Sequence, residues 1–379
     1  MKQLIISFLI ITTLSCSKKQ INLDHKSLSE YTIVTDNRAI ADTLNVYLKK
    51  SLGIELPIKN DFKEINKYIH LKYNSDIIND FISLSFSNYA ITIQGNNSKM
   101  LNYGVYEFLE MYLGVRWYST DLTLVPEISS ITIPLEKEIV YKPSVTTRTV
   151  HSRLFYDDSS FADKLKVSNE AFPNYVPNAR VHTFHRFIPY NKFHDDHPEY
   201  YALRNGKRLA TQLCLTNEKV LGIVKDSVAS FFKKNDLSSV ISVSQDDNTQ
   251  YCMCDACSEI DEKEGSPAGS MIYFVNKIAK SFPEKTISTL AYQYTRKPPI
   301  TKPESNVLIT LCSIECDRSI PISEGCIDFQ NDLKGWSKLT ENIRIWDYTT
   351  QFTNFLAPFP NRATIKPNIK ILFILLVEI

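Results

Sequence analysis

Apolar and polar residues repeat with two different periods along the chain, and the changes of period mark the predicted elements. Alternating runs, the pattern of half-buried strands, occur at 31–35, 67–71, 89–93 and 131–134. Residues 40–52 and 101–112 instead repeat apolar side chains every three or four positions, as one face of a helix does. Together these elements predict a small N-terminal α/β domain over residues 31–140, ending before Pro143.

Beyond that boundary, short β-rich runs alternate with helical stretches, which is the pattern of parallel sheets and barrels. The runs that predict strands are 145–150, 179–184, 211–215, 240–244, 286–292, 307–314 and 343–348. Helices are predicted to start at Asn217 and at Ser266, where serine is a natural N-cap and Pro267 a natural first residue. The predicted fold class is therefore α/β, with an incomplete (β/α)8 TIM-type barrel over residues 141–379, one strand short of eight.

Polar and aromatic side chains gather at the ends of these predicted strands. Asp246 and Asp247 follow the run 240–244 and precede a loop, which is where an α/β barrel holds its chemistry. Adjacent carboxylates repel, so their pKa values separate and one can stay protonated while the other ionises, as hydrolysis of a sugar linkage requires. A solvated turn is the simpler interpretation, because Asp and Asn favour turns. Further residues at strand ends favour a carbohydrate site: Arg148, His182, Asn248, Tyr292, Tyr294, Glu315, Trp346 and Asp347.

Charge and the first residues bear on partners and location. The chain has 43 basic and 42 acidic side chains, a balance that argues against nucleic acid as a partner. Residues 1–16 combine one lysine, a short apolar stretch and a small residue before Cys16, which resembles a bacterial lipoprotein signal. We expect an exported protein, lipid-anchored to a membrane at Cys16, with residues 17–30 as a linker. Lys18 and Lys19 favour a periplasm-facing anchor over surface display, and a plain signal peptide is the alternative.

Three clustered cysteines, Cys252, Cys254 and Cys257, allow two interpretations. They supply three thiolates, but a structural zinc requires four ligands. Residues that can supply a fourth ligand, or form disulfides, are Cys214, Cys312, Cys316 and Cys326. We expect a disulfide-braced loop, with structural zinc as the alternative. A catalytic zinc of the deaminase kind needs a nearby His-x-Glu, and the sequence has none near this cluster.

Residues 102–368 resemble the endo-β-N-acetylglucosaminidases of glycoside hydrolase family 163, found mainly in Bacteroidetes. The matching stretches are 103–110, 113–118, 182–184, 197–203, 212–217, 243–247, 251–257, 264–267, 290–294, 311–316 and 345–348. The stretches before residue 119 also resemble the small domain that precedes the barrel in hexosaminidases and α-glucuronidases.

The resemblance implies cleavage of the β-1,4 bond in the chitobiose core of N-glycans, with retention and without a metal or other cofactor. A 2-acetamido sugar can attack its own anomeric carbon, so the enzyme needs no nucleophile of its own. We assign Asp246 to hold the acetamido N–H and Asp247 as general acid/base, with Glu315 as the rival acid. The residues expected to bind substrate are Arg148, His182, Asn248, Tyr292, Tyr294, Trp346 and Asp347.

The apolar ending after Asn368 departs from this family, which continues through a last strand and a further region. We expect a barrel truncated before or within its last strand, with residues 371–379 in the vacant strand position or a nearby crevice.

The sequence leaves two alternatives to an active endoglycosidase. One is a catalytically impaired remnant or glycan-binding lipoprotein, and the other is a zinc-dependent hydrolase.

Overall fold

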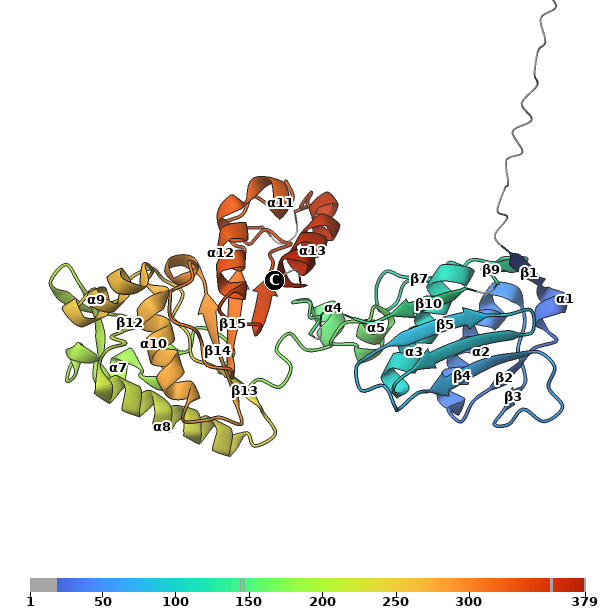
Figure 1. Ribbon diagram of the computed structural model, residues 1–379, viewed down its shortest axis with the longest axis horizontal. Coiled ribbons are helices and arrows are strands. Elements are labelled where there is room, and N and C mark those ends of the chain that lie inside the picture. Colours follow the sequence, from blue (N-terminus) through green and yellow to red (C-terminus); the bar gives the residue numbers. More distant parts are fainter. Residues whose placement is uncertain (1–18, 136, 144, 146, 355–356, 378–379) are drawn as a thin grey trace, which may run out of the picture. The chain divides into compact units, whose positions relative to one another are not determined.

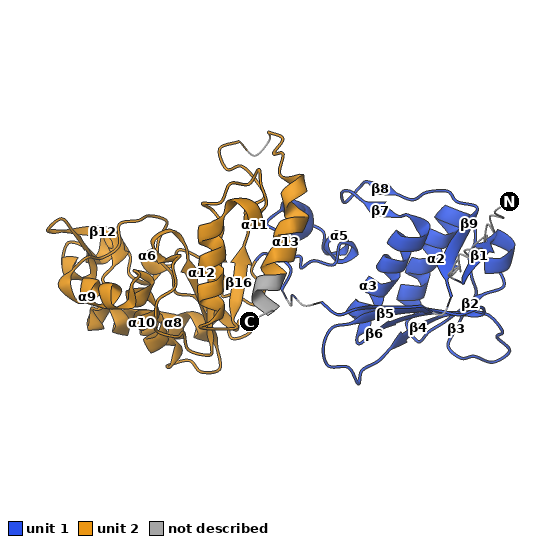
Figure 2. Cartoon of the chain, turned by 45° about the horizontal axis from the view of Figure 1, so that its top comes forward, with its two compact units in different colours: residues 1–171 blue, residues 172–379 orange. Residues whose placement is uncertain are grey.

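The chain divides into two compact units, residues 1–171 and 172–379, in the computed structural model (Figures 1 and 2). The structure describes residues 19–377 except 136, 144, 146, 355 and 356, and only the backbone of residues 374–377. The predicted signal at 1–16 and the lipidation site Cys16 lie outside the described residues and stay predictions. Among the described residues, no helix is both long and apolar enough to cross a bilayer.

The first unit is built on a six-stranded mixed sheet in the order β10-β5-β6-β4-β2-β3. Its strands are β2 (Thr32–Val34), β3 (Ile58–Lys59), β4 (Tyr68–Tyr73), β5 (Ile82–Phe86), β6 (Ala90–Gly95) and β10 (Glu138–Tyr141). Two antiparallel pairs flank it, β1 (Gln20–Asp24) with β9 (Ser130–Pro134) and β7 (Arg116–Trp117) with β8 (Thr123–Leu124). Its helices are α1 (His25–Leu28), α2 (Arg38–Leu52), α3 (Ser98–Phe108), α4 (Arg153–Tyr156) and α5 (Ser159–Lys164).

Helices α2 and α3 lie on one face of this sheet (Figure 2). The Asn37 side chain accepts the backbone N–H of Ile40 and starts α2, and Gly53, at φ 69°, ends it in the left-handed conformation. Leu44 and Leu48, one turn apart on α2, are fully buried in the core against the sheet. The residues that repeat in the apolar pattern of the sequence therefore form the buried face of α2.

Gly95→Ala should destabilise the first unit. A Cβ at Gly95, where β6 leads into α3, would lie 2.4 Å from the backbone N of Leu101 and 2.6 Å from the carbonyl C of Met100. Since backbone atoms cannot rotate away, α3 must shift, and we expect a loss of about 1–3 kcal/mol in the free energy of unfolding. Gly222→Ala is the matched control, because Gly222 is exposed in α8 (Glu218–Lys234) with nothing within 4 Å of the added Cβ.

Gly222→Ala should stabilise by about 0.5–1 kcal/mol, since alanine favours a helix over the unfolded chain. Denaturant-unfolding midpoints of the two variants should therefore move in opposite directions. If Gly95→Ala had the same unfolding midpoint as Gly222→Ala, the structure would accommodate the added Cβ at Gly95 without loss of stability.

The second unit contains a four-stranded parallel sheet in the order β13-β14-β15-β16. These strands are β13 (Val240–Ser242), β14 (Thr286–Ala291), β15 (Val307–Cys312) and β16 (Ile343–Trp346). An antiparallel hairpin joins β11 (Tyr201–Arg204) to β12 (Lys207–Leu213). The helices are α6 (Phe184–Phe187), α7 (Tyr190–Phe193), α8, α9 (Asp255–Glu264), α10 (Ala268–Ala279), α11 (Ile322–Gly325), α12 (Ile327–Ser337) and α13 (Arg362–Val377). Helix α10 packs on the sheet, with Phe274, Val275 and Ile278 fully buried.

The parallel sheet has fewer strands than the seven predicted from the sequence. Run 211–215 belongs mostly to the β11–β12 hairpin, because Asn205 and Gly206 both have positive φ and close a tight two-residue turn. Run 179–184 is not a strand, and His182 at φ 52° interrupts any extended conformation there. Run 145–150 makes one isolated bridge, between Thr149 and Ser168.

The boundary between the units also lies later than the predicted position near Pro143. Phe161 of α5 is buried in the first unit's core, and Lys166 forms ion pairs with Glu107 and Glu110 beside α3. Residues 141–171 therefore group with the first unit rather than with the second.

Residues 371–377 of the apolar segment are helical and do not take a strand position, while residues 378–379 lie outside the described residues. In α13, Thr364, Asn368 and Leu372 are buried at intervals of four residues, and Leu372 joins the core of the second unit. That spacing matches the 3.6-residue period of a helix and places the three side chains on one face. The helix packs against α11 and α12.

Candidate functional site

The carboxyl ends of β13, β14, β15 and β16 lie at one edge of the sheet, because these four strands are parallel. The segments that follow them carry most of the residues singled out in the sequence: Asp246, Asp247 and Asn248 after β13, Tyr292 and Tyr294 after β14, Glu315 after β15, and Asp347 after β16, with Trp346 ending β16. The sheet thus places along one edge residues that are up to 101 positions apart, as Asp246 after β13 and Asp347 after β16 are. This edge is the candidate site.

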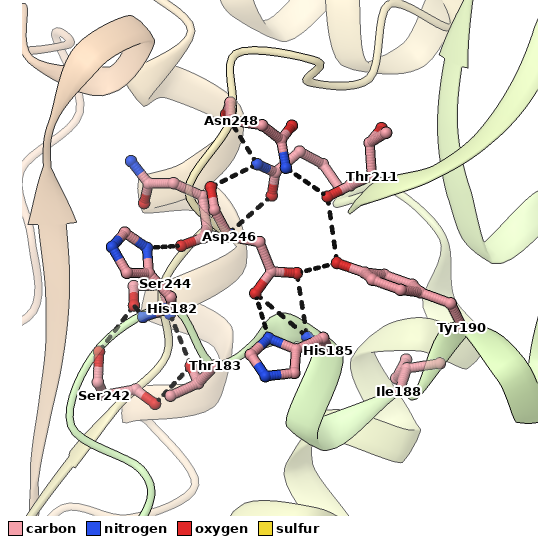
Figure 3. Close-up of polar contacts among 12 residues, drawn as sticks. His182, Thr183, His185, Ile188, Tyr190, Thr211, Ser242, Ser244, Asp246 and Asn248 are labelled. Atoms are coloured by element: carbon pink, nitrogen blue, oxygen red, sulfur yellow. Dashed lines mark hydrogen bonds and ion pairs between the residues drawn. The ribbon is translucent and has the colours of Figure 1, made fainter.

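Asp246 is buried, with 6% of its surface exposed, and both of its carboxylate oxygens accept hydrogen bonds (Figure 3). The His185 backbone N–H donates to Oδ2 (3.1 Å) and the His185 ring N–H donates from Nδ1 to Oδ1 (2.6 Å). The Tyr190 hydroxyl donates to Oδ2. Burial and the nearby carboxylate raise the pKa of Tyr190, which keeps this phenol protonated as a donor. Asp246 is therefore fixed in position by three donors from the segment 185–190.

Gln212 holds the backbone of the loop that carries the acid pair. Its amide, 1% exposed, accepts the Asp246 N–H (3.0 Å) and donates to the carbonyl oxygens of Asp246 (2.7 Å) and Asn248 (2.9 Å). The Asn248 side chain donates to the Thr211 carbonyl oxygen (3.0 Å) and accepts from Gln250 N–H (3.0 Å). The Asn248 side chain therefore holds the shape of the loop. The substrate contact expected for Asn248 from the sequence stays a prediction.

Asp247, unlike Asp246, is exposed. The Tyr292 hydroxyl donates to its Oδ1 (3.0 Å), and the Gln293 amide donates to the Tyr292 hydroxyl oxygen (3.1 Å). Burial and the Asp247 carboxylate raise the pKa of Tyr292, so this phenol stays protonated and keeps donating. The two adjacent aspartates therefore differ in environment, one buried and held by three donors, the other open to solvent with one phenol beside it.

Two residues near Tyr292 have an unusual backbone conformation. His182 and Gln293 both have a φ of 52°, which few residues other than glycine adopt, although asparagine, aspartate and histidine do so more often than the rest. His182 donates from Nδ1 to the Gln245 carbonyl oxygen (2.8 Å), and its ring lies edge-on to Tyr292, with centroids 5.9 Å apart. Such strained residues cluster at functional sites, where surrounding contacts hold them in place. Their position next to Asp247 supports this edge as the site.

An aromatic surface continues along the same edge. The rings of Trp346 and Tyr348 are stacked, with centroids 6.2 Å apart and planes 11° from parallel, and both are partly exposed. They pack on Leu290, Tyr292 and Cys312. Asp347, between them in the sequence, accepts from the Ser313 hydroxyl (2.6 Å) and from the Asn368 amide (3.3 Å), so its carboxylate is tied to the residue that follows β15 and to α13.

Three other predicted residues have different surroundings. Glu315 is exposed and lies 3.7 Å from the Arg296 guanidinium. Tyr294 stacks on Tyr251 with centroids 4.7 Å apart, on the side of the Cys252 loop. Arg148 belongs to the first unit, where its guanidinium donates to the carbonyl oxygens of Val145 (2.8 Å) and Lys166 (3.0 Å).

The cysteine loop does not form the disulfides expected from the sequence. Cys252, Cys254 and Cys257 are free, and their sulfur atoms lie with that of Cys214 within 4.8 Å of one another. The described disulfide joins Cys316 to Cys326 instead. Because the cluster's sulfurs converge on one point and are not bonded in pairs, they form a four-thiol group that can hold a metal ion.

Residues beyond those predicted to act on substrate also build the site. His185, Tyr190 and Gln212 form hydrogen bonds with Asp246 from 34 to 61 positions away. Gln212 and the His182-Thr-Phe stretch lie within the matched motifs, which was the available signal for them. Nothing local marked Tyr190, which is one of several tyrosines in an aromatic-rich segment.

Comparison with known proteins gives a family match and distant structural likenesses. A family model described as "Domain of unknown function (DUF4838)" matches residues 117–378. No curated protein matches the chain by sequence. The chain is similar to a β-N-acetylhexosaminidase from Bacteroides fragilis, with a TM-score of 0.44 and 12% identity over 92% of this chain and 77% of that one.

Two further solved structures are similar to the chain. The family 20 β-N-acetylhexosaminidase from Streptomyces coelicolor has a TM-score of 0.42 and 10% identity, over 92% of this chain and 78% of that one. A family 89 glycoside hydrolase from Clostridium perfringens has a TM-score of 0.36 and 11% identity. That match covers 72% of this chain, and the chain spans only 39% of the length of that enzyme.

Proposed function

The chain belongs to the family described as "Domain of unknown function (DUF4838)", and we propose that it is a glycoside hydrolase acting on N-acetylglucosamine-containing glycans. One observation carries the proposal. Asp246 and Asp247 are adjacent at the carboxyl edge of a parallel sheet, yet one is buried and held by three donors while the other is exposed. Two carboxylates in different environments are what general acid catalysis beside a second carboxylate requires.

Asp247 acts as the general acid/base in this proposal. Its carboxyl group faces solvent, so it can reach the oxygen of a glycosidic bond, and one of its oxygens already has the Tyr292 hydroxyl as a donor. The other oxygen remains available to deliver a proton to the leaving group and then to take one from water. The strained residues His182 and Gln293 keep Tyr292 and the loop in place around it.

Asp246 is proposed to position the substrate's acetamido group. A carboxylate has about four lone-pair positions, and three donors occupy Asp246, which leaves room for one further N–H. An acetamido group held in this way can attack its own anomeric carbon through its carbonyl oxygen and form an oxazolinium intermediate. The enzyme then needs no nucleophile, and water attack on the intermediate gives retention.

The stacked pair Trp346 and Tyr348 provides the sugar-binding surface. An aromatic ring binds the apolar face of a sugar ring, and two parallel rings form a rigid platform of this kind. Because both rings are partly exposed on the edge that carries Asp247, a glycan can contact them while its scissile bond lies near the acid. We propose the chitobiose core of N-glycans as the substrate, in line with the resemblance of the motifs to endo-β-N-acetylglucosaminidases.

Mass spectrometry of an N-glycoprotein after incubation with the purified chain tests this function. One N-acetylglucosamine left on each glycosylated asparagine supports endo-acting cleavage. Loss of single terminal sugars would indicate an exo-acting glycosidase instead. Intact glycans that bind the protein would favour a glycan-binding role, carried by Trp346 and Tyr348 without catalysis.

A thiazoline analogue of cyclised N-acetylglucosamine should inhibit competitively. The analogue mimics the oxazolinium intermediate, so it should bind at least about 100-fold more tightly than N-acetylglucosamine itself, as transition-state analogues do. Inhibition constants of the two compounds, measured against the same glycopeptide, check the prediction. A trapped glycosyl ester on Asp246 or Asp247 would contradict substrate assistance, because it would identify a carboxylate nucleophile.

A further inference from the structure

We propose that Cys214, Cys252, Cys254 and Cys257 bind one Zn²⁺ ion in a closed structural site. This inference is independent of the proposed glycosidase activity, since none of the four residues belongs to the acid pair or the aromatic surface. Four protein thiolates fill the tetrahedral coordination of zinc and leave no open position for water or substrate. The site therefore supports the fold and does not make the protein a zinc-dependent hydrolase.

The sulfur positions fit a tetrahedral metal site. All four lie within 4.8 Å of one another, and the Cys214 and Cys254 sulfurs are 3.6 Å apart. Zn–S bonds of about 2.3 Å place the sulfurs of a tetrahedral site about 3.8 Å apart, so only small movements are needed to close the shell. Three of the four residues are buried and Cys254 is partly buried.

Donors around the cluster suit a group of negatively charged sulfurs. The Leu203 backbone N–H donates to the Cys252 sulfur (3.4 Å), and the Arg208 guanidinium lies 4.0 Å from the same atom. The Thr216 hydroxyl contacts the Cys257 sulfur at 3.3 Å. Four thiolates on Zn²⁺ carry a net charge of −2, and hydrogen-bond donors of this kind orient and stabilise such ligands.

Disulfides are the competing chemistry, and the structure argues against them here. Cys316 and Cys326, in the same unit, are covalently paired, whereas the four sulfurs of the cluster are not bonded and surround one point. Thiolate ligands select soft or borderline metals, and zinc is the usual occupant of a tetrahedral site with four sulfurs and no redox role. Each thiol releases its proton as the metal binds.

The site would join three segments around the acid pair. Cys214 directly follows β12, Cys252 and Cys254 lie in the loop after β13, and Cys257 is in the first turn of α9. Gln212, two positions before Cys214, makes the three hydrogen bonds to the backbone of Asp246 and Asn248. Zinc would therefore tie the end of β12, which carries Gln212, to the loop after β13, which carries Asp246 and Asp247.

Metal analysis of the full chain, purified without chelators and under reducing conditions, tests the proposal first. We expect about one zinc per chain, as four-cysteine sites hold. After zinc is removed, titration with Co²⁺ should give thiolate-to-cobalt charge-transfer bands in the near ultraviolet and tetrahedral d–d bands in the red. Iron with visible absorption, or no metal with no cobalt bands, would overturn the zinc assignment. So would two disulfides within the cluster, seen by non-reducing peptide mapping.

Substitutions separate the cluster from Cys312, a free cysteine elsewhere in the described part of the chain. Cys257→Ser and Cys214→Ser should lower the zinc content at least about tenfold, because a tetrahedral site loses a quarter of its ligands. Cys312→Ser is the matched control, since Cys312 is buried and free but lies outside the cluster, and it should keep a full zinc complement. Equal zinc content in all three variants would place the metal elsewhere. If the cluster variants do not fold, the cobalt spectrum of the unaltered chain still decides the question.

Discussion

Asp247→Asn is expected to lower turnover of a natural N-glycan by about 100- to 10,000-fold, the usual contribution of a general acid/base. The amide keeps the size of the side chain, and its oxygen can still accept a hydrogen bond from the Tyr292 hydroxyl, so the loop should be undisturbed. Glycan binding should change little, because proton transfer to the leaving oxygen matters in the transition state and not in the ground state. Initial rates and binding isotherms on the same glycopeptide measure the two effects.

Glu315→Gln is the comparison that gives this result its meaning. Glu315 is exposed, and its carboxylate lies 3.7 Å from the Arg296 guanidinium. Its neighbour is therefore a cation, whereas the neighbour of Asp247 is the Tyr292 hydroxyl. We expect the variant to retain most of its turnover. An aryl glycoside whose leaving group needs no proton should also be hydrolysed by Asp247→Asn far better than the natural substrate. If Glu315→Gln is the inactive variant and Asp247→Asn remains active, the acid has been assigned to the wrong residue.

The parallel sheet could be predicted because each of its strands is a local feature of the sequence. Runs 240–244, 286–292, 307–314 and 343–348 correspond to β13, β14, β15 and β16. Their β-branched residues are flanked by turn residues, so the pattern and the structure agree within a few positions. The partners of these strands were also predictable, since consecutive βα units place parallel strands side by side.

The other strands predicted for the barrel are not part of the parallel sheet, because an apolar run does not specify which strand it pairs with. Run 211–215 has the composition of a buried strand, but the Asn205-Gly206 turn pairs it with β11 in a hairpin. Asn-Gly is itself a strong local signal for a two-residue hairpin turn. The segment 371–379 is apolar at nearly every position, so periodicity could not separate a strand from a helix there.

The site divides in the same way into local and distant parts. Asp246, Asp247, Tyr292 and Trp346 could be named because each follows or ends a predictable strand. Tyr190 could not, since it contacts Asp246 across 56 positions through side chains that only the fold brings together. Cys214, 38 positions before Cys252, was one of four candidates for the missing ligand, and the fold is what selects it from Cys312, Cys316 and Cys326.

Asp246→Asn should lower both the free energy of unfolding and the turnover, whereas Asp247→Asn should lower the turnover alone. The Asp246 carboxylate accepts the His185 backbone N–H, the His185 ring N–H and the Tyr190 hydroxyl. An amide has one acceptor oxygen, so its NH2 group would replace the oxygen that accepts from either His185 or Tyr190, and a hydrogen bond to a charged acceptor is lost in a site only 6% exposed. Hydrogen bonds to a charged group contribute about 1.5–3 kcal/mol each. We therefore expect a loss on the order of 3 kcal/mol in the free energy of unfolding, measured by denaturant unfolding.

The two substitutions are chemically identical and adjacent in the chain, so any difference between them comes from the environment of each side chain. Asp247→Asn should leave the unfolding midpoint of the protein nearly unchanged, because Asp247 is exposed and keeps its one neutral donor. Asp246→Asn should lower the midpoint and also reduce turnover, since the position that accepts the acetamido N–H is then occupied by an amide that can rotate. Tyr190→Phe isolates the structural part: it removes one donor from Asp246 while the carboxylate remains, so it should lose stability with a smaller loss of turnover. Should Asp246→Asn be as stable as the unaltered protein, the hydrogen bonds from His185 and Tyr190 would not hold this carboxylate, and its proposed role as a fixed acceptor would fail with them.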